Sequence, residues 1–305
     1  MKQKLRKVNP EYPSLKALFR NKGFTPKKRL GQNFIISRGV SQKFVRLCNI
    51  KPSDIVIEIG PGLGALTFEL SKSAKKIIAL EVDQALYSLL KEKISETGTK
   101  NIEIINEDVL NFQFSIFNFQ SMPNFQFSNY KAVGNLPFSS GVAIVMKYLE
   151  SPNPPQTITI ILQKEVAQRI VSKPPQMEKL AVFCQALSQP KILSNIKKGN
   201  FFPEPKVDST IIQFTNIQET LNQEFPGQPK GVLSDGYSSF QKVVNAGFAF
   251  PRKTLLNNLS RGLSLSKEKT TLLLKQSNLL PHQRPQQLSV SRWLSLSKTK
   301  NSLRD

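Results

Sequence analysis

The sequence predicts an α/β fold with a largely parallel sheet, followed by a small helical domain. From Asp54 onward, short runs rich in β-branched residues alternate with helical patterns, as in sheets whose parallel strands are joined by helices. Beyond Ser238, leucines recur with helical spacing and no strand pattern is apparent. A chain of 305 residues, 39% of them hydrophobic, is long enough to bury such a core.

Five apolar runs are the expected strands. They are IVIEIG at 55–60, IIALEV at 77–82, IEII at 102–105, KAVGN at 131–135 and TITIIL at 157–162. Amphipathic stretches that end near Lys72 and Ile94 separate the first three runs and are expected to be helices. In the C-terminal part, TLLNNL, TLLLKQ and WLSL carry the helical spacing.

Two segments interrupt this pattern. Residues 111–130 are rich in Asn, Gln, Ser and Phe, and are expected to form a loop with aromatic anchors, in the manner of an insertion. Residues 217–238 are polar and punctuated by Pro and Gly, as expected of a domain linker. The predicted organisation is therefore a basic extension at 1–26, an α/β domain at 27–216, this linker, and a helical domain at 239–305.

The charge balance points to a polyanionic partner. Lys and Arg number 43 against 21 Asp and Glu, which gives a formal net charge of +22 and a pI near 10.0. Neutralising phosphates releases condensed counterions, so such a chain is suited to nucleic acid. A merely Lys-rich, solvated surface explains the charge equally well.

Membrane, secretory and metal-binding classes are not indicated. No stretch reaches the ~18 to 20 unbroken apolar residues of a spanning helix, and the basic amino terminus has no secretory apolar run. Cys48 and Cys184 have no Cys or His cluster around them, so no metal site is expected. His282, the only histidine, is not expected to take part in catalysis. The expected compartment is the cytoplasm.

A glycine motif predicts a nucleoside site. Gly60, Gly62 and Gly64 follow the first apolar strand and are expected to open a helix, where glycines permit a tight turn and close backbone approach to a ligand. The spacing is GxGxG and not the GxGxxG of dinucleotide sites. Glu81 ends the next strand, where a carboxylate can accept ribose hydroxyls, and Asp108 follows the third, placed to reach an adenine amino group. Either carboxylate alone would more often be an exposed strand end.

The motif Asn135-Leu136-Pro137-Phe138 carries the predicted chemistry. It follows the apolar strand KAVG, at the edge where open α/β sheets bind ligands. An adenine amino group is a poor nucleophile because its lone pair is delocalised into the ring, and hydrogen-bond acceptors favour the form with a localised lone pair. The Asn135 side-chain oxygen and the Leu136 carbonyl are the expected acceptors, on a backbone that Pro137 restricts. Phe138 is expected to stack on a base rotated out of its RNA. Taken alone, the motif is also typical of a turn after a strand.

Nine segments of the chain carry a family resemblance. They are KKRLGQNF at 27–34, EIGPGLGALT at 58–67, LEVD at 80–83, NEDVL at 106–110, GNLPF at 134–138, LQKEVAQRI at 162–170, FFPEPKVDST at 201–210, FAFPRKTLLNNL at 248–259 and RPQQLSV at 284–290. In type and order they resemble the ribosomal RNA adenine dimethyltransferase family, and specifically its small-subunit branch. The resemblance extends from Lys27 to Leu294.

The resemblance implies a class I S-adenosylmethionine-dependent methyltransferase with a Rossmann-like, mostly parallel sheet and a small helical C-terminal domain. It implies dimethylation of the N6 amino groups of two adjacent adenosines in the 3′-terminal hairpin loop of small-subunit (16S) rRNA, during biogenesis of that subunit. The implied partners are the small ribosomal subunit and its rRNA, and no membrane partner is implied. A monomer would suffice for this activity.

The site residues carried over from the family fall into three groups. The implied cofactor contacts are Asn33, Ile35, Gly60, Gly62, Glu81, Asp108 and Asn135. The implied target-adenine site is Asn135, Leu136, Pro137 and Phe138. The implied RNA contacts are Lys27, Lys28, Arg29, Arg252 and Lys253, for which a solvated surface is the alternative. The family often has tyrosine where this chain has Phe138. The phenylalanine ring can still stack on a base, but it lacks the hydroxyl group through which a tyrosine could make a further contact.

Three rival functions are weighed against this one. The large-subunit branch of the family, whose members methylate a single adenosine and confer macrolide resistance, is disfavoured by FFPEPKVDST and RPQQLSV. A non-catalytic ribosome-assembly factor is disfavoured by the intact glycine loop and the intact Asn-Leu-Pro-Phe motif. A nicotinamide dehydrogenase would need a GxGxxG turn, which the sequence lacks.

Overall fold

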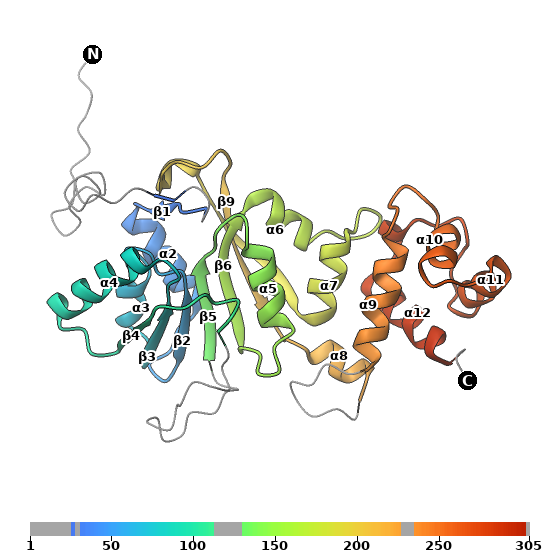
Figure 1. Cartoon of the computed structure of the whole chain (residues 1–305), viewed down its shortest axis with the longest axis horizontal. Coiled ribbons are helices and arrows are strands. Elements are labelled where there is room, and N and C mark those ends of the chain that lie inside the picture. Colours follow the sequence, from blue (N-terminus) through green and yellow to red (C-terminus); the bar gives the residue numbers. More distant parts are fainter. Residues whose placement is uncertain (1–25, 28–30, 113–129, 227–234, 303–305) are drawn as a thin grey trace, which may run out of the picture.

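The computed structural model describes residues 26–27, 31–112, 130–226 and 235–302, which form a seven-stranded sheet flanked by helices and a helical C-terminal domain (Figure 1). Nearly all of the basic N-terminal extension lies outside the described residues, as do residues 113–129 of the predicted loop.

Five parallel and two further strands form the main sheet. The strands are β2 (Ile55–Ile59), β3 (Lys76–Leu80), β4 (Ile102–Ile105), β5 (Tyr130–Asn135), β6 (Thr157–Gln163), β7 (Gln189–Ile196) and β9 (Ser209–Thr215). Their order is β4-β3-β2-β5-β6-β9-β7, and the first five are parallel neighbours, which confirms the five predicted strands and the α/β class. The chain runs outward from β2 to β4 and then returns to β5 on the other side of β2. The border between β2 and β5 is therefore the switch point of the sheet.

The sequence analysis missed the last two strands of the sheet. β9 pairs antiparallel with both β6 and β7, so β9 lies inside the sheet and β7 forms its edge. Ile211, Ile212 and Phe214 of β9 are fully buried, whereas β7 is polar, partly exposed and contains Pro190. Proline within sheets is largely confined to edges, which agrees with the position of β7. The apolar residues of β9 carried a strand signal, but β7 had almost none.

Helices cover both faces of the parallel strands. They are α2 (Arg38–Cys48), α3 (Thr67–Ser71), α4 (Gln84–Thr97), α5 (Gly141–Leu149), α6 (Lys164–Ile170) and α7 (Lys179–Leu187). On one face, Val56 of β2 shares a buried cluster with Phe44 of α2 and Leu70 of α3. On the other face, Ile57 shares a buried cluster with Ile144 of α5. Burial on both faces explains why these strands are nearly continuous apolar runs in the sequence.

The C-terminal domain is helical, as the sequence predicts. It comprises α9 (Asp235–Gly247), α10 (Leu255–Gly262), α11 (Lys267–Gln276) and α12 (Val290–Ser302). The ring of Phe240 on α9 packs edge-on against Phe183 of α7, with ring centroids 6.1 Å apart. The Tyr237 hydroxyl donates a hydrogen bond of 2.6 Å to Glu150 at the end of α5. The helical domain therefore shares a packed boundary with the sheet domain (Figure 1).

The segment predicted as a linker, 217–238, contains a helix that the sequence analysis did not foresee. This helix is α8 (Glu219–Glu224), and its Leu221 is buried. Gln218, directly before α8, is 2% exposed, and its side-chain amide donates hydrogen bonds of 2.9 Å to two carbonyl groups at the end of α5. Residues 227–234 lie outside the described part. The first part of the segment is thus fixed to the sheet domain by a buried glutamine.

Both cysteines are free thiols in the interior. Cys48 and Cys184 are both buried, and burial raises the pKa of each thiol to about 12. Both stay protonated at neutral pH and act as small apolar side chains. Within the described part of the chain, no helix is both long enough and apolar enough to cross a membrane.

We expect Phe240→Ala to destabilise the protein by about 3–5 kcal/mol, because it removes a fully buried ring at the boundary between the two domains. Urea unfolding followed by circular dichroism measures the loss. Phe250→Ala is the matched control, since it removes a ring that is 46% exposed, and we expect a loss below about 1 kcal/mol. Equal losses in the two variants would show that the boundary does not contribute to stability.

Candidate functional site

The carboxyl ends of four neighbouring parallel strands meet at the switch point of the sheet. The glycine motif follows β2, Glu81 follows β3, Asp108 follows β4, and Asn135 ends β5. Open parallel sheets bind their ligands in the crevice at this place. The structure therefore brings the predicted cofactor residues and the Asn-Leu-Pro-Phe motif to one edge.

The glycine loop turns before its helix begins. Gly60, Gly62 and Gly64 have φ angles of 65°, 56° and 84°, a region that other residues rarely adopt. A Cβ on Gly62 would lie 3.1 Å from the ring of Phe34, whereas a Cβ on Gly60 would meet no atom within 4 Å. The glycines lead from β2 into a helix, as predicted, with a turn over 62–66 before α3 starts at Thr67. A ligand beside Gly60 would contact the backbone of this loop and not a helix end.

Glu81 is a buried carboxylate that holds the glycine loop. It is 4% exposed, its Oε2 accepts a hydrogen bond of 3.0 Å from the Gly62 N–H, and its Oε1 accepts one of 2.9 Å from the Asp83 N–H. Burial raises the pKa of Glu81, and these two N–H groups oppose the rise. A carboxylate has about four lone-pair sites, so Glu81 retains acceptor capacity for a ligand hydroxyl.

Glu58, the first residue of the glycine motif, is a second buried carboxyl group. It is 1% exposed, and its Oε2 has no hydrogen-bond partner among the described residues. Burial raises the pKa of Glu58 to about 8, and the Glu81 carboxylate adds to the rise. Glu58 is therefore mostly protonated at neutral pH, and sequence reasoning gave it no role beyond its place in the motif.

A lysine fixes the loop that contains Asp108. Oδ1 of Asp108 accepts a hydrogen bond of 2.9 Å from the Leu110 N–H, which leaves Oδ2 for a ligand. Lys147 of α5 donates from Nζ to the carbonyls of Leu110 at 2.5 Å and Phe112 at 2.9 Å. Burial lowers the pKa of Lys147, while Asp108 and Glu107 oppose this. The loop after β4 is thus tied to the helix that follows the Asn-Leu-Pro-Phe motif, a link that spacing in the sequence does not reveal.

The orientation of the Asn135 side chain is set by the N-terminal segment. Its Nδ2 donates a hydrogen bond of 2.7 Å to the Asn33 carbonyl, so the amide presents its Oδ1 as an acceptor. Asn33 is held in turn, because its own Nδ2 donates to the Gly31 carbonyl at 3.0 Å. The backbone oxygen of Asn33 therefore contacts Asn135, another predicted site residue. The sequence did not indicate this role for the backbone of Asn33.

The rest of the Asn-Leu-Pro-Phe motif joins β5 to α5. Leu136 is 2% exposed, and its N–H donates to the Ile161 carbonyl at 3.2 Å. The Pro137 carbonyl accepts a hydrogen bond of 2.9 Å from the Gly141 N–H, at the start of α5. Phe138 is partly buried. These bonds fix the backbone of the motif at both ends.

The segment 31–36, which we call the strap, is held over this edge of the sheet from several sides. Within it, β1 (Phe34–Ile35) pairs antiparallel with β8 (Phe201–Phe202), so the FFPEPKVDST segment supports the strap. Gln32 donates from Nε2 to Oδ2 of Asp83 at 3.1 Å. The strap thus connects the Glu81 region with Asn135.

Lys27 takes a different place from the one that the sequence suggests. Its Nζ lies 2.9 Å from Oδ2 of Asp83, whose side chain is fully buried, whereas the lysine was predicted to contact RNA. The ion pair compensates the charge of the buried Asp83 carboxylate and fixes the chain just before the strap. Lys28 and Arg29 lie outside the described residues.

Two exposed apolar side chains flank the carboxylates. Val82, directly after Glu81, is 51% exposed, and Leu110, two residues after Asp108, is 38% exposed. Exposed apolar side chains beside a few placed polar groups are typical of a ligand site. Sequence reasoning missed both, although a valine between two acidic residues at a strand end was the available signal.

Arg252 and Lys253 lie in the C-terminal domain and not at the sheet edge. Both are exposed on the turn between α9 and α10. The side chain of Asn258, which is 1% exposed, exchanges hydrogen bonds of 3.1 and 3.0 Å with the N–H and carbonyl of Phe250, and so fixes this turn. The Arg261 guanidinium lies 5.1 Å from the centre of the exposed Phe250 ring. Basic groups and an aromatic ring therefore share one rigid, exposed turn.

A family model described as ribosomal RNA adenine dimethylase matches residues 23–302. The chain is 38% identical to a ribosomal RNA small subunit methyltransferase A of Dehalococcoides mccartyi, over 93% of each chain. It is 36% identical to the protein of the same name from Bacillus licheniformis, over 92% of this chain and 94% of the relative.

Solved structures agree on the fold. A dimethyladenosine transferase from Plasmodium falciparum superposes with a TM-score of 0.71 and 21% identity, covering 88% of this chain and 98% of the other. The 23S rRNA methyltransferase ErmE superposes with a TM-score of 0.64 and 23% identity, covering 88% and 99%. Both likenesses extend over most of this chain and support the predicted fold, and neither distinguishes between RNA substrates.

We expect Glu58→Gln to flatten the pH dependence of stability. The folded pKa of about 8 exceeds the usual 4.5, so the contribution of Glu58 is full below pH 4.5 and is lost as the pH rises toward 8. In this window the native protein should lose up to about 1.4 kcal/mol per pH unit relative to the glutamine variant. Urea unfolding at pH 5 and pH 8 measures the difference.

The control for this prediction is Glu103→Gln, at a carboxylate that is 40% exposed and paired with Lys76. It should leave the slope of stability against pH unchanged. Parallel slopes for the native protein and Glu58→Gln would mean that Glu58 is ionised in the folded protein.

Proposed function

The chain belongs to the ribosomal RNA adenine dimethylase family, and we propose that it dimethylates N6 of two adjacent adenosines in the 3′-terminal hairpin loop of small-subunit rRNA. The observation that carries the proposal is the orientation of Asn135. Its amide nitrogen donates to the Asn33 carbonyl, which leaves its oxygen as the acceptor for the target amino group.

The cofactor of the family reaction is S-adenosylmethionine, which supplies a methyl group on a positively charged sulfur when it is bound. The residues at the sheet edge fit this molecule. The space beside Gly60 admits a ligand against the loop backbone, and Glu81 retains lone pairs for ribose hydroxyls. The exposed apolar surfaces of Val82 and Leu110 suit the faces of an adenine ring, with Oδ2 of Asp108 to accept from its amino group.

The chain's own residues prepare the target amino group. Oδ1 of Asn135 and the Leu136 carbonyl each accept one amino hydrogen, which favours the pyramidal nitrogen whose lone pair is localised. Phe138 stacks on the base and holds it in place. The attacking nitrogen becomes positively charged on methylation and releases its proton to water, so the reaction needs no general base from the protein.

The small subunit is favoured over the large one by the relatives. Both proteins named above as small subunit methyltransferases match at more than a third identity over nearly the whole chain. The segments FFPEPKVDST and RPQQLSV, which resemble the small-subunit branch, contribute β8 and the start of α12. The rRNA is also the partner that the net charge of +22 suits.

We propose that the turn with Arg252 and Lys253 contacts the rRNA, with Phe250 available to stack on an unpaired base. We also propose that the protein acts as a monomer in the cytoplasm, since methyl transfer from a bound cofactor to the rRNA requires no second copy of the chain. Lys27 pairs with Asp83 just before the strap, and its side chain is 42% exposed, so its predicted contact with RNA stays a prediction.

The test of the function is transfer of labelled methyl from S-adenosylmethionine to purified unmethylated small subunits, with large subunits in parallel, followed by nucleoside analysis. We expect dimethyladenosine in the small subunit alone. Label confined to the large subunit would assign the chain to the resistance branch. Tight binding to small subunits without label would identify a non-catalytic assembly factor.

Two variants separate the proposed roles within the site. We expect Asn135→Ala to lower kcat by roughly 10²–10³-fold, as removal of one preorganised hydrogen-bonding group does in other enzymes, with little change in the KM for S-adenosylmethionine. Glu81→Ala should instead raise that KM by about 10-fold or more, since it removes a charged hydrogen-bonding group.

Steady-state kinetics with small subunits measures both variants. Glu103→Ala, at an exposed carboxylate on β4, is the control and should change neither constant. Native kcat in Asn135→Ala would refute its role as an acceptor.

A further inference from the structure

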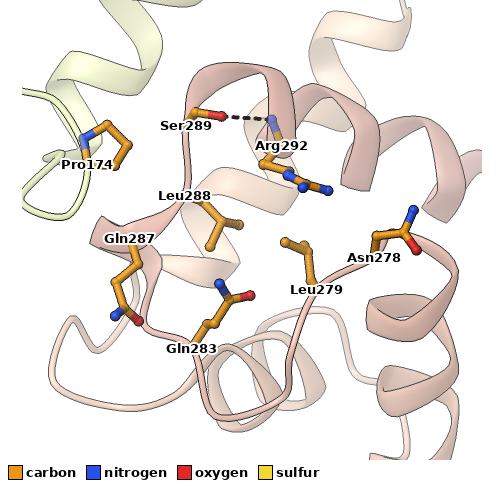
Figure 2. Close-up of a pocket in the computed structure, with 8 residues that line it drawn as sticks. All are labelled: Pro174, Asn278, Leu279, Gln283, Gln287, Leu288, Ser289 and Arg292. Carbon is orange, nitrogen blue, oxygen red and sulfur yellow. Dashed lines mark hydrogen bonds between the residues drawn. The ribbon is translucent and has the colours of Figure 1, made fainter.

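A notch lies where the C-terminal domain meets the loop between α6 and α7 (Figure 2). Its volume is about 240 Å³, and its apolar part is formed by Leu279, Leu288 and the ring of Pro174. Pro174 comes from the α6–α7 loop, whereas the two leucines come from the segments before α12. The notch therefore spans the two domains, at a place separate from the cofactor edge.

Two glutamines offer hydrogen-bond donors to the notch. Oε1 of Gln283 accepts a hydrogen bond of 2.9 Å from the Leu280 N–H, and Oε1 of Gln287 accepts one of 2.7 Å from the Arg284 N–H. These bonds fix the orientation of both amides and leave each Nε2 as a donor. Figure 2 shows the amide of Gln283 between Leu288 and Leu279.

Arg292 adds a positive charge to this set. It lies in the first turn of α12 and is exposed, and within the described part of the chain no carboxylate is paired with it. In Figure 2 its guanidinium group lies over the side of the notch formed by Leu279. No acidic residue lines the notch, so its chemistry suits a ligand that offers acceptor oxygens and negative charge.

We propose that this notch binds one unpaired nucleotide of the rRNA substrate, at a position away from the methylated adenosines. The base packs on Leu279, Leu288 and Pro174, Gln283 donates to an oxygen or ring nitrogen of the base, and Arg292 pairs with the phosphate. The volume of about 240 Å³ is below the roughly 300–1,000 Å³ of pockets for drug-sized ligands, which suits a group of the size of a single base.

The position of the notch gives this contact a role in substrate choice. The Met177 N–H, on the same loop as Pro174, donates to the Gln286 carbonyl at 3.0 Å, so both walls of the notch are tied together. The loop follows α6, which follows β6, the neighbour of the strand that carries Asn135. A nucleotide in the notch is therefore held at a fixed position relative to the target base. This inference rests on the proposed activity on rRNA and adds a second point at which the RNA fold is recognised.

The test uses variants that preserve the fold of the notch. Gln283→Glu keeps an oxygen for the Leu280 N–H, but replaces the donor by a negatively charged acceptor. Arg292→Ala removes the phosphate partner. The controls are Gln223→Glu on α8 and Lys275→Ala on α11, which make the same changes of charge at exposed positions outside the notch.

We expect Gln283→Glu and Arg292→Ala each to raise the KM for small subunits by about tenfold, with kcat and the KM for S-adenosylmethionine unchanged. The controls should change the KM for small subunits by less than about twofold. An equal rise in the KM for small subunits in variants and controls would mean that only the overall charge matters, and would overturn the proposal. Absence of methylation by the native protein would refute the proposed function itself, which keeps the two failures distinct.

A second measurement identifies what occupies the notch. A benzophenone side chain at position 287, on the rim, is irradiated in the complex with purified small subunits, and the adduct is digested with ribonuclease or with protease. We expect an adduct to rRNA. An adduct to a ribosomal protein alone, or no adduct to RNA, would overturn the proposal.

Discussion

The contact between β2 and β5 is the constraint on which the site depends. A Cβ on Gly134 would lie 2.5 Å from the Ile59 carbonyl oxygen, closer than side-chain and backbone atoms can approach. Gly134 precedes Asn135, and Ile59 precedes Gly60, so this contact sets the separation between the acceptor amide and the glycine loop. A side chain at position 134 would push apart the two strands at the switch point, where the site is built.

The charge of the site differs in sign from that of the whole chain. The chain has a formal net charge of +22, yet Glu58, Glu81, Asp83 and Asp108 gather at one edge of the sheet. Burial raises the pKa of Glu58 to about 8, so this group adds little negative charge beside Glu81. A local negative edge suits a cationic methyl donor, whereas the positive surface suits a polyanionic substrate. The two requirements are met in one chain because three of the four carboxyl groups are buried and the lysines and arginines are largely exposed.

Residues far apart in the sequence hold the site together. The Asn33 carbonyl orients Asn135, and Lys147 ties the loop after β4 to α5. Asp83 accepts a hydrogen bond from Gln32 of the strap and forms an ion pair with Lys27, which lies before the strap. The first two links tie the segment that carries Asn135 to the strap and to the loop of Asp108, and the third ties the strap to the end of β3. The relative positions of the proposed site residues therefore depend on contacts between segments far apart in the sequence.

The sequence alone determined the α/β class, five of the seven strands, the helical C-terminal domain and the residues at the strand ends. These features are local, because apolar runs and glycine spacing are written in consecutive residues. Only the tertiary structure decided that β9 lies inside the sheet, that α8 occupies part of the predicted linker, and that α3 starts after the glycine turn. It also decided the burial of Glu58, the ion pair of Lys27, and the bonds from Lys147 and Asn135. The physical reason is that burial and hydrogen bonding depend on which distant segments pack together, and no pattern of neighbouring residues contains that information.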